Sequence, residues 1–179
     1  MNVKNNKRAR ESKSKLCDTL LDMIAKVGYK GLSVKDLCKE AKINRTTFYT
    51  HYDNIEDVLY QICEDYTLKI YAAFANDKLE YRERVKLALG ILEKKIDFFK
   101  YVLNTVNALD LRVLEIVEKN IKKPYTDATT KLRLMYRISG IIGVLKLTLC
   151  YNQKTEDKTP SLDNIVDLIC NIKHPKNIL

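Results

Sequence analysis

The segment from Arg45 to Tyr52 combines side chains that could recognise a nucleic acid. Its eight residues supply a guanidinium, an imidazole, three threonine hydroxyls and two phenols, and they include no carboxylate. Such groups donate hydrogen bonds to phosphate oxygens and to base edges, and no acid is present to repel the phosphates. An exposed polar helix in any helical protein would also fit this composition. Whether the segment can bind a nucleic acid therefore depends on the secondary-structure elements that position it.

Helical spacing gives the segment an inward and an outward side. At 100° per residue, Phe48 and Tyr52 share the inward side because they are four residues apart. Thr46 and Thr50 then point outward, and Arg45 lies in the first turn, where a recognition helix usually meets base edges. The remaining polar residues lie on the flanks: Tyr49 on one, and Thr47 and His51 on the other.

Another short amphipathic helix is predicted directly before this segment. Ser33 can cap it, with Asp36 three residues later in the capping-box position. Apolar residues then recur at helical spacing at Val34, Leu37, Cys38 and Ala41. Residues 42–44 form a turn in which Ile43 packs the two helices together and Asn44 caps the second helix. The pattern of residues 33–52 therefore predicts a helix-turn-helix whose second helix enters the major groove of DNA.

Residues 15–68 resemble the DNA-binding region of TetR-type transcriptional regulators. In that family a first helix ends near a Gly, a Ser or Thr opens the second helix, and the recognition helix follows the pattern [ST]-[RK]-[GAT]-T-[FL]-Y-x-[HY]-[FY]. This chain supplies Gly28, Gly31, Ser33 and the nine residues 44–52. Two positions differ from what is usual in the family: Thr46 stands where a smaller residue is usual, and Ile55, at the start of the fourth helix, stands where a Lys is common. The second difference removes one expected phosphate contact.

The resemblance and the helical spacing together assign DNA-contacting residues. We expect Arg45, Thr46 and Thr50 to touch bases, with Arg45 favouring guanine and the Thr methyls favouring thymine. The remaining members of the set would hold the DNA backbone. The full expected DNA-binding set is Ser33, Lys35, Arg45, Thr46, Thr47, Tyr49, Thr50 and His51.

The positive charge is concentrated at the N-terminal end of the chain. Residues 1–52 contain 12 Lys and Arg against 5 Asp and Glu, which gives +7 of the total formal charge of +9. A basic end of this kind is typical of a protein with a polyanionic partner, although a solubilising tail would look similar. Residues 1–13 are almost devoid of apolar side chains, so we expect a disordered basic arm that becomes ordered on or near DNA.

Composition excludes several other classes. The longest apolar run, Ile138–Leu145, is far shorter than the ~20 residues that span a bilayer, and no secretory segment is apparent. The five cysteines are scattered and most simply fill the core; a redox-sensing role for one of them is the alternative. No catalytic set or metal cluster has useful spacing, so we predict a cytoplasmic protein that is not an enzyme, has no cofactor and does not contact a membrane.

The fold class that we predict is all-α, with a three-helix DNA-binding head and a helical-bundle body. The head covers residues 14–54 and the body residues 55–179. A long fourth helix runs from about Ile55 to Ala75, with Asp53 and Glu56 in capping-box spacing. Further helices are predicted at 81–95, 96–105, 109–122, 127–151 and 161–172, the last with Thr159 and Pro160 as its start signal.

Two sets of residues in the body carry further hypotheses. Aromatic side chains could line a small-molecule pocket, although ordinary core packing is the simpler interpretation: Tyr66, Phe98, Phe99, Tyr101 and Tyr136. The last two helices could pair with those of a second subunit, as in the proteins this chain resembles, or could instead close the chain's own core. The expected dimer residues are Gly140, Gly143, Leu147, Leu162, Ile165, Val166 and Ile169.

These observations predict a ligand-responsive repressor that binds a palindromic DNA operator as a homodimer. The effector would be a small molecule bound in the body. A TetR-like activator is one alternative, because the direction of control is not written in these residues. A protein-binding adaptor with a degenerate DNA-binding head is the other. Ile55 favours the adaptor, and the intact segment 45–52 opposes it.

Overall fold

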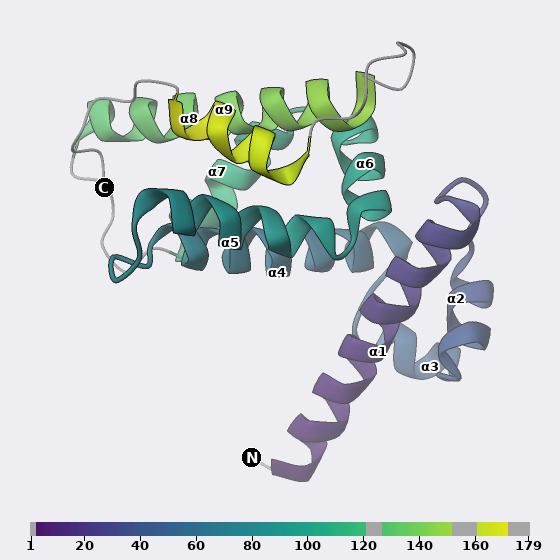
Figure 1. The fold of residues 1–179 in the computed structure, drawn as a ribbon. Helices are drawn as coiled ribbons and strands as arrows, with labels where there is room; N and C mark the ends of the chain where they lie inside the picture. Colours follow the sequence, from purple (N-terminus) through teal and green to yellow (C-terminus); the bar gives the residue numbers. More distant parts are fainter. Residues whose placement is uncertain (1–2, 121–126, 152–160, 172–179) are drawn as a thin grey trace. The chain divides into compact units, whose positions relative to one another are not determined.

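A computed structural model describes residues 3–120, 127–151 and 161–171 (Figure 1). Every regular element within these ranges is helical, which confirms the predicted all-α class. The chain divides into two compact units, residues 1–65 and residues 66–179. The division lies inside α4 (Ile55–Phe74), whereas the sequence had suggested a body that begins at residue 55.

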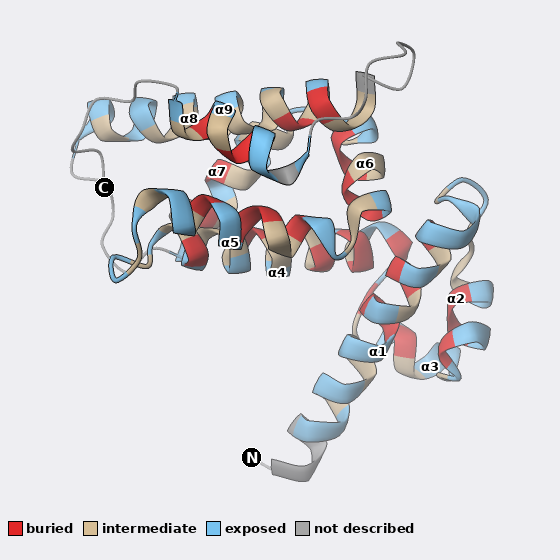
Figure 2. Ribbon diagram, viewed as in Figure 1, coloured by how far each residue is buried: buried red, intermediate tan, exposed pale blue. Residues whose placement is uncertain are grey.

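The first unit is a small bundle formed by α1 (Val3–Val27), α2 (Val34–Ala41), α3 (Arg45–Tyr49) and the first half of α4. Each helix contributes apolar side chains to one core, which appears as the buried positions in Figure 2. The most deeply buried of these are Leu16, Leu20, Leu37, Phe48, Val58 and Ile62. Within this unit α2 packs on α1, and α3 packs on α2.

The N-terminal residues differ from the expected disordered arm, because α1 already begins at Val3. Residues 3–13 contain no Gly or Pro, and Lys, Arg, Ala and Glu among them favour helix. The Lys7–Glu11 ion pair, 3.9 Å long at i,i+4 spacing, and the hydrogen bond from Ser12 Oγ to the Arg8 carbonyl both lie along the helix. Helix propensity therefore outweighs the lack of apolar side chains. The helix ends at Val27, as predicted, where Gly28 has a φ of 75° and donates its N–H to the Ile24 carbonyl.

The start of α4 is correct in position but not in its cap. The expected pair was Asp53 and Glu56, whereas Asn54 Oδ1 accepts the Asp57 N–H at 2.9 Å. The Asp57 carboxylate in turn accepts the Asp53 N–H at 2.9 Å. Because the helix begins at Ile55, the capping positions lie one residue later than the sequence had suggested.

The second unit is built from the second half of α4 and five further helices, close to the predicted ranges. They are α5 (Tyr81–Glu93), α6 (Ile96–Thr105), α7 (Leu109–Asn120), α8 (Ala128–Lys146), which continues as a π-helical turn (Leu147–Tyr151), and α9 (Leu162–Asn171). Within this unit α9 packs on α5, and α7 packs on α8. The core between them includes Val85, Phe98, Val102, Val166 and Ile169.

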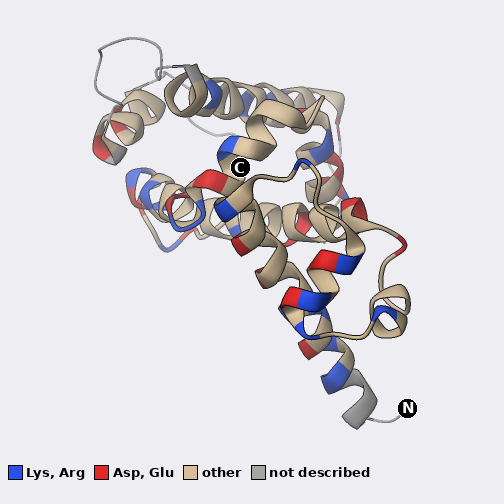
Figure 3. Ribbon diagram, turned by 90° about the vertical axis from the view of Figure 1, so that its right-hand side faces the viewer, with Lys and Arg blue, Asp and Glu red and all other residues tan. Residues whose placement is uncertain are grey.

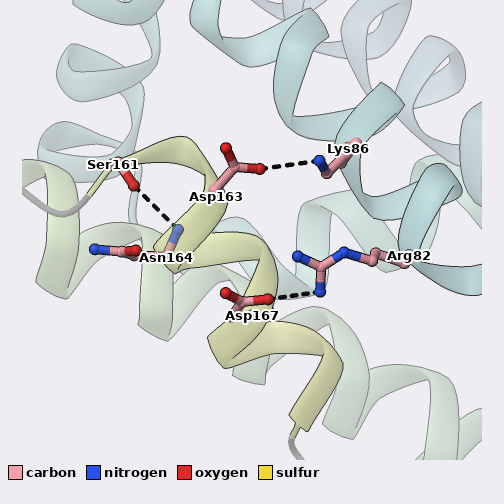
Figure 4. A network of polar contacts seen from close by, with 6 residues as sticks. All are labelled: Arg82, Lys86, Ser161, Asp163, Asn164 and Asp167. Carbon is pink, nitrogen blue, oxygen red and sulfur yellow. Dashed lines mark hydrogen bonds and ion pairs between the residues drawn. The ribbon is translucent and has the colours of Figure 1, made fainter.

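Two ion pairs fix the direction in which α9 lies on α5 (Figure 4). Arg82 pairs with Asp167 at 2.5 Å, and Lys86 pairs with Asp163 at 2.9 Å. Since the residue numbers rise on one helix as they fall on the other, the two helices are antiparallel. Ser161 Oγ caps α9 by accepting the Asn164 N–H at 3.2 Å, so the helix starts after Ser161. Thr159 and Pro160, the expected start signal, lie outside the described residues.

No helix in the described ranges has the length and apolar character that crossing a membrane requires.

Candidate nucleic-acid interface

The first helix of the helix-turn-helix is held by a cap at each end. At its start, Ser33 has extended backbone angles, and its Oγ accepts the Asp36 N–H at 3.2 Å. The same hydroxyl donates its proton to the Asp36 carboxylate. A Ser cap of this kind typically stabilises a helix by about 1 kcal/mol. Because the hydroxyl is engaged in the cap, we expect Ser33 to position α2 in addition to any contact it makes with phosphate.

The turn between the two helices depends on one left-handed residue. Lys42 has φ 53° and ψ 43°, so its N–H reaches the Lys39 carbonyl and the following Ile43 N–H reaches the Cys38 carbonyl. This pair of hydrogen bonds is the Schellman arrangement, in which a Gly is usual at the left-handed position. Ile43 is half-buried beside it, as the predicted packing residue of the turn. The chain then turns directly into the cap of α3.

The recognition helix is very short, so its orientation depends on contacts outside it. Asn44 caps it as predicted, with Oδ1 accepting the Thr46 N–H at 3.1 Å. The α-helix covers residues 45–49, and helical hydrogen bonds continue to Tyr52, whose N–H donates to the Phe48 carbonyl at 3.0 Å. Phe48 is fully buried, and its ring lies 5.8 Å from that of Tyr52. The predicted inward side is therefore the observed one.

The outward side of this segment is polar and exposed, as the spacing predicted. Arg45, Thr46, Tyr49 and Thr50 are exposed, and Thr47 and His51 are half-buried. Lys35, at the start of α2, is exposed and Ser33 is half-buried, which completes the expected set of eight residues. Tyr49 is 57% exposed although its ring packs edge-on against Phe48 at 5.3 Å. A large side chain held at a fixed angle and open to solvent is well suited to contact a partner.

A buried polar contact joins the end of the recognition segment to α1. Tyr52 Oη and Cys17 Sγ lie 3.7 Å apart in the core. Burial raises the pKa of both groups, so the phenol and the thiol stay protonated and neutral at pH 7. A protonated, buried Cys17 is a poor nucleophile, which supports the interpretation of this cysteine as a core residue.

Lys13 is a member of this region that the sequence did not single out. Its ammonium lies 5.7 Å from the centre of the Tyr52 ring, within the range of a cation–π contact. Burial lowers the pKa of the nearby His51 imidazole below its ordinary value of 6.5, and the charge of Lys13 lowers it further. Helical spacing could have identified Lys13 from the sequence. It lies four residues before Cys17, on the stripe of α1 that faces the core.

The match to a known family coincides with this region. Residues 16–62 match the model of the bacterial regulatory proteins of the tetR family. Residues 16–62 are therefore the part of the chain that is similar to the TetR family. The chain is also 26% identical, over 91% of its own length, to an uncharacterized HTH-type transcriptional regulator of Bacillus subtilis (strain 168), YuxN. The chain spans about half of that curated relative, 54% of its length.

Solved structures support the same fold. A TetR transcriptional regulator from Streptococcus agalactiae 2603V is 18% identical, with a TM-score of 0.61 over 92% of this chain and 94% of that one. The dihydroxyacetone kinase operon activator DhaS is 19% identical, with a TM-score of 0.62 over 90% and 93% of the two chains. The names of the family and of these proteins denote regulators rather than enzymes.

The aromatic residues that could line a pocket are only partly brought together in the structure. Tyr66, Phe98 and Phe99 form a cluster with ring centres 5.1 to 6.2 Å apart, and both phenylalanines are buried. Tyr101 is half-buried further along α6. Tyr136 is 66% exposed on α8, so it does not belong to a pocket that the cluster would line within one chain. Core packing explains the cluster as well as ligand binding does.

The expected dimer residues separate into two groups. Gly140, Gly143 and Leu147 are exposed on the outer side of α8. Ile165, Val166 and Ile169 are buried within the chain, where α9 packs on α5, so they serve the chain's own core. The amphipathic pattern of α9 identified a buried face but could not identify what covers it. Leu162 begins α9, and its side chain is outside the described part of the structure.

Proposed function

We propose that this chain is a DNA-binding transcriptional regulator of the TetR family that acts in the cytoplasm as a homodimer on a palindromic operator. The observation that carries the proposal is the exposed, acid-free side of α3. On the opposite side of α3, Phe48 is buried in the core, and the Asn44 cap and the turn at Lys42 orient the helix. In this proposal Arg45 and Thr46 reach base edges in the major groove, and Tyr49 and His51 hold the backbone.

The outer side of α8 supports the homodimer. Leu132, Tyr136 and Leu147 are 69%, 66% and 61% exposed, and Gly140 and Gly143 lie between them on the same side. The spacing of 4, 4, 3 and 4 residues makes one continuous helical stripe. Solvent-exposed apolar stripes of this kind usually mark an interaction site.

The two glycines of this stripe point to a helix as the partner. The Cβ of an Ala at either position would lie more than 4 Å from other parts of the described chain, so packing among the described residues does not require glycine there. Each glycine nevertheless costs the helix about 1 kcal/mol relative to Ala. Small residues let a second helix approach closely, and a second copy of α8 would supply that helix by two-fold symmetry.

Two such chains would present two recognition helices to one face of the duplex. Half-sites about one DNA turn apart, roughly 34 Å, suit a two-fold dimer of helix-turn-helix units. We propose repression as the direction of control, with a small molecule in the body as the signal. Such an effector can shift the regulator only by the difference between its affinities for the DNA-bound and the unbound state. DhaS is named as an operon activator, so activation is the alternative that a relative favours.

The test is a selection from a pool of random duplexes, followed by affinity measurements at several salt concentrations. We expect an enriched inverted repeat that binds two chains, with an affinity that falls steeply as salt rises. Arg45→Ala/Tyr49→Ala should abolish binding without changing the unfolding transition. Lys39→Ala/Tyr60→Ala, which also removes one cation and one exposed tyrosine from the first unit, is the matched control and should bind normally.

The same experiment addresses the adaptor alternative. Ile55 is buried in the first unit, so it cannot serve as the phosphate-contacting Lys that is common at this position. If the wild-type chain enriches no duplex even in dilute buffer, DNA binding is excluded and the adaptor becomes the better interpretation. Specific enrichment that Arg45→Ala/Tyr49→Ala removes would exclude the adaptor.

A further inference from the structure

The first three turns of α1 extend beyond the bundle that the rest of the helix helps to form (Figure 1). Among the side chains of α1 that the structure describes, from Lys7 onward, the first buried one is Leu16, and the later ones follow at helical spacing to Ile24. Residues 3–13 lie upstream of all of them and still form helix. We call residues 3–13 the α1 extension. At 1.5 Å per residue it is about 16 Å long.

The α1 extension has an unusual charge for the start of a helix. It contains five Lys and Arg and one Glu, and its first turn has no acidic residue. Lys7, Arg8, Arg10 and Lys13 account for the basic residues in its described side chains (Figure 3). The N-terminal end of a helix already carries partial positive charge, so cations there repel it and one another. A polyanion along this helix would relieve that repulsion.

The side of the extension that continues the core-facing stripe is fixed relative to the recognition segment. Lys13 lies over the Tyr52 ring, and Cys17, one turn later, contacts the Tyr52 hydroxyl. Arg10 lies three residues before Lys13 and is exposed on the same stripe. The single acid, Glu11, is about 100° around the helix from Arg10 and about 160° from Lys13. The stripe that borders His51 and Tyr52 is therefore basic and acid-free, like the recognition segment itself.

We propose that the α1 extension is a preformed second DNA contact, in which Arg10 and Lys13 bind backbone phosphates that flank the base pairs read by α3. The inference rests on the proposed DNA binding and adds a partner surface to it. At 3.4 Å per base pair, a helix about 16 Å long reaches along about five base pairs. Rigidity matters because an arm that is already helical loses less conformational entropy on binding than a disordered one.

The experiment compares two duplexes that share one selected core sequence. The short duplex ends at the core, and the long duplex carries about eight further base pairs on each side, more than the extension can reach. Wild-type protein should bind the long duplex more tightly. Arg10→Gln/Lys13→Gln should bind both duplexes equally, and its salt dependence on the long duplex should fall by about one unit of slope per replaced cation, hence about four for a dimer.

A matched control separates a local contact from net charge. Lys15→Gln/Lys26→Gln removes the same charge from exposed positions that lie about 140° to 160° around α1 from Lys13. This control should retain the wild-type preference for the long duplex. Equal losses in both double variants would overturn the proposal in favour of a general charge effect. Thermal unfolding of each variant shows whether the bundle is intact.

A third variant tests the helical state of the extension. Ser12→Pro keeps every charge, but proline in a helix interior removes a hydrogen bond and clashes with the preceding turn. We expect it to reduce the preference for the long duplex, because the turns before residue 12, including Arg10, are released from the helix while Lys13 stays in place. An unchanged preference would overturn the requirement for a preformed helix. Wild-type protein that binds the core but gains nothing from the flanks would overturn the inference and leave the proposed function standing.

Discussion

The two compact units differ in the kind of side chain that one of their helices exposes to solvent. In the first unit, α3 buries its one large apolar side chain, Phe48, and exposes polar groups around it. In the second unit, α8 exposes Leu132, Tyr136 and Leu147 on one side. The first unit thus buries the apolar side of α3 in its own core and exposes the polar side, which suits a polar partner. The second exposes an apolar stripe within the described residues, and this stripe is the basis of the proposed dimer.

This difference predicts that the two surfaces respond to substitution in opposite ways. On α3, stability depends on the inward residues and binding depends on the outward ones. On α8, the outward glycines and apolar residues should control assembly while contributing little to the fold of one chain. Two pairs of variants test this contrast, and the pair with the larger expected effect comes first.

The largest effect is expected at the inward side of α3. Phe48→Ala removes a fully buried ring and should destabilise the first unit by about 3–5 kcal/mol, because a cavity remains where the ring was. Tyr49→Ala, next to it and largely exposed, should change the free energy of unfolding by about 0.5 kcal/mol or less. Denaturant unfolding followed by circular dichroism measures both. Similar destabilisation by the two variants would contradict the inward and outward assignment.

A smaller effect is expected from the glycines of α8. Gly140→Ala/Gly143→Ala places two methyl groups where the chain itself has open space, so helix propensity should stabilise one chain by up to about 1 kcal/mol per site. The same methyl groups should weaken the proposed dimer by about 1–3 kcal/mol, since a closely packed interface has no room for them. Sedimentation equilibrium measures the dimer dissociation constant.

Gly90→Ala is the control for this pair. Gly90 lies in α5, and the Cβ of an Ala there would also lie more than 4 Å from other parts of the described chain. The control should gain helix stability and leave the dimer unchanged. A dimer that tolerates Gly140→Ala/Gly143→Ala as well as it tolerates Gly90→Ala would show that α8 is not the interface.

The contrast between the units also explains how far the sequence could be interpreted. Caps and turns depend on residues a few positions apart, so the sequence correctly predicted Ser33 and Asn44 as helix caps. The capping residues of α4 were predicted one position too early. A helical stripe, by contrast, shows that a face is buried without showing what buries it. For this reason Val166 was assigned to a partner although it packs inside the chain, and Tyr136 was assigned to a pocket although it is exposed.

At the N-terminus, the sequence pattern led to the prediction of too little structure. Low apolar content predicted disorder for residues 1–13, yet residues 3–13 form helix, because helix propensity needs no buried face when the rest of α1 already nucleates the helix. Lys13 was overlooked for a related reason. Its position depends on Tyr52, which is distant in sequence and is brought near by the packing of α1 against the end of the recognition segment.

The smallest effect that we predict is a pH dependence centred on His51. In the unbound protein, burial and Lys13 hold the pKa of the imidazole below 6.5, so the folded protein takes up a proton less readily than the unfolded chain. The contribution of His51 to folding stability should therefore be present above pH 6.5 and should decline as the pH falls below it. A phosphate beside the imidazole would have the opposite effect and raise its pKa.

DNA binding should consequently strengthen as the pH falls from about 7.5 to about 5.5, by up to about tenfold per imidazole for each unit by which the phosphate raises the pKa. His51→Gln retains a hydrogen-bond donor but cannot titrate, so its affinity should lose this dependence. Lys13→Gln removes one cause of the low pKa of His51 in both the free and the bound state, so the pH dependence should move to higher pH. If wild type and His51→Gln share one pH profile, His51 does not contact phosphate, and the basic side of the first unit is smaller than its sequence suggests.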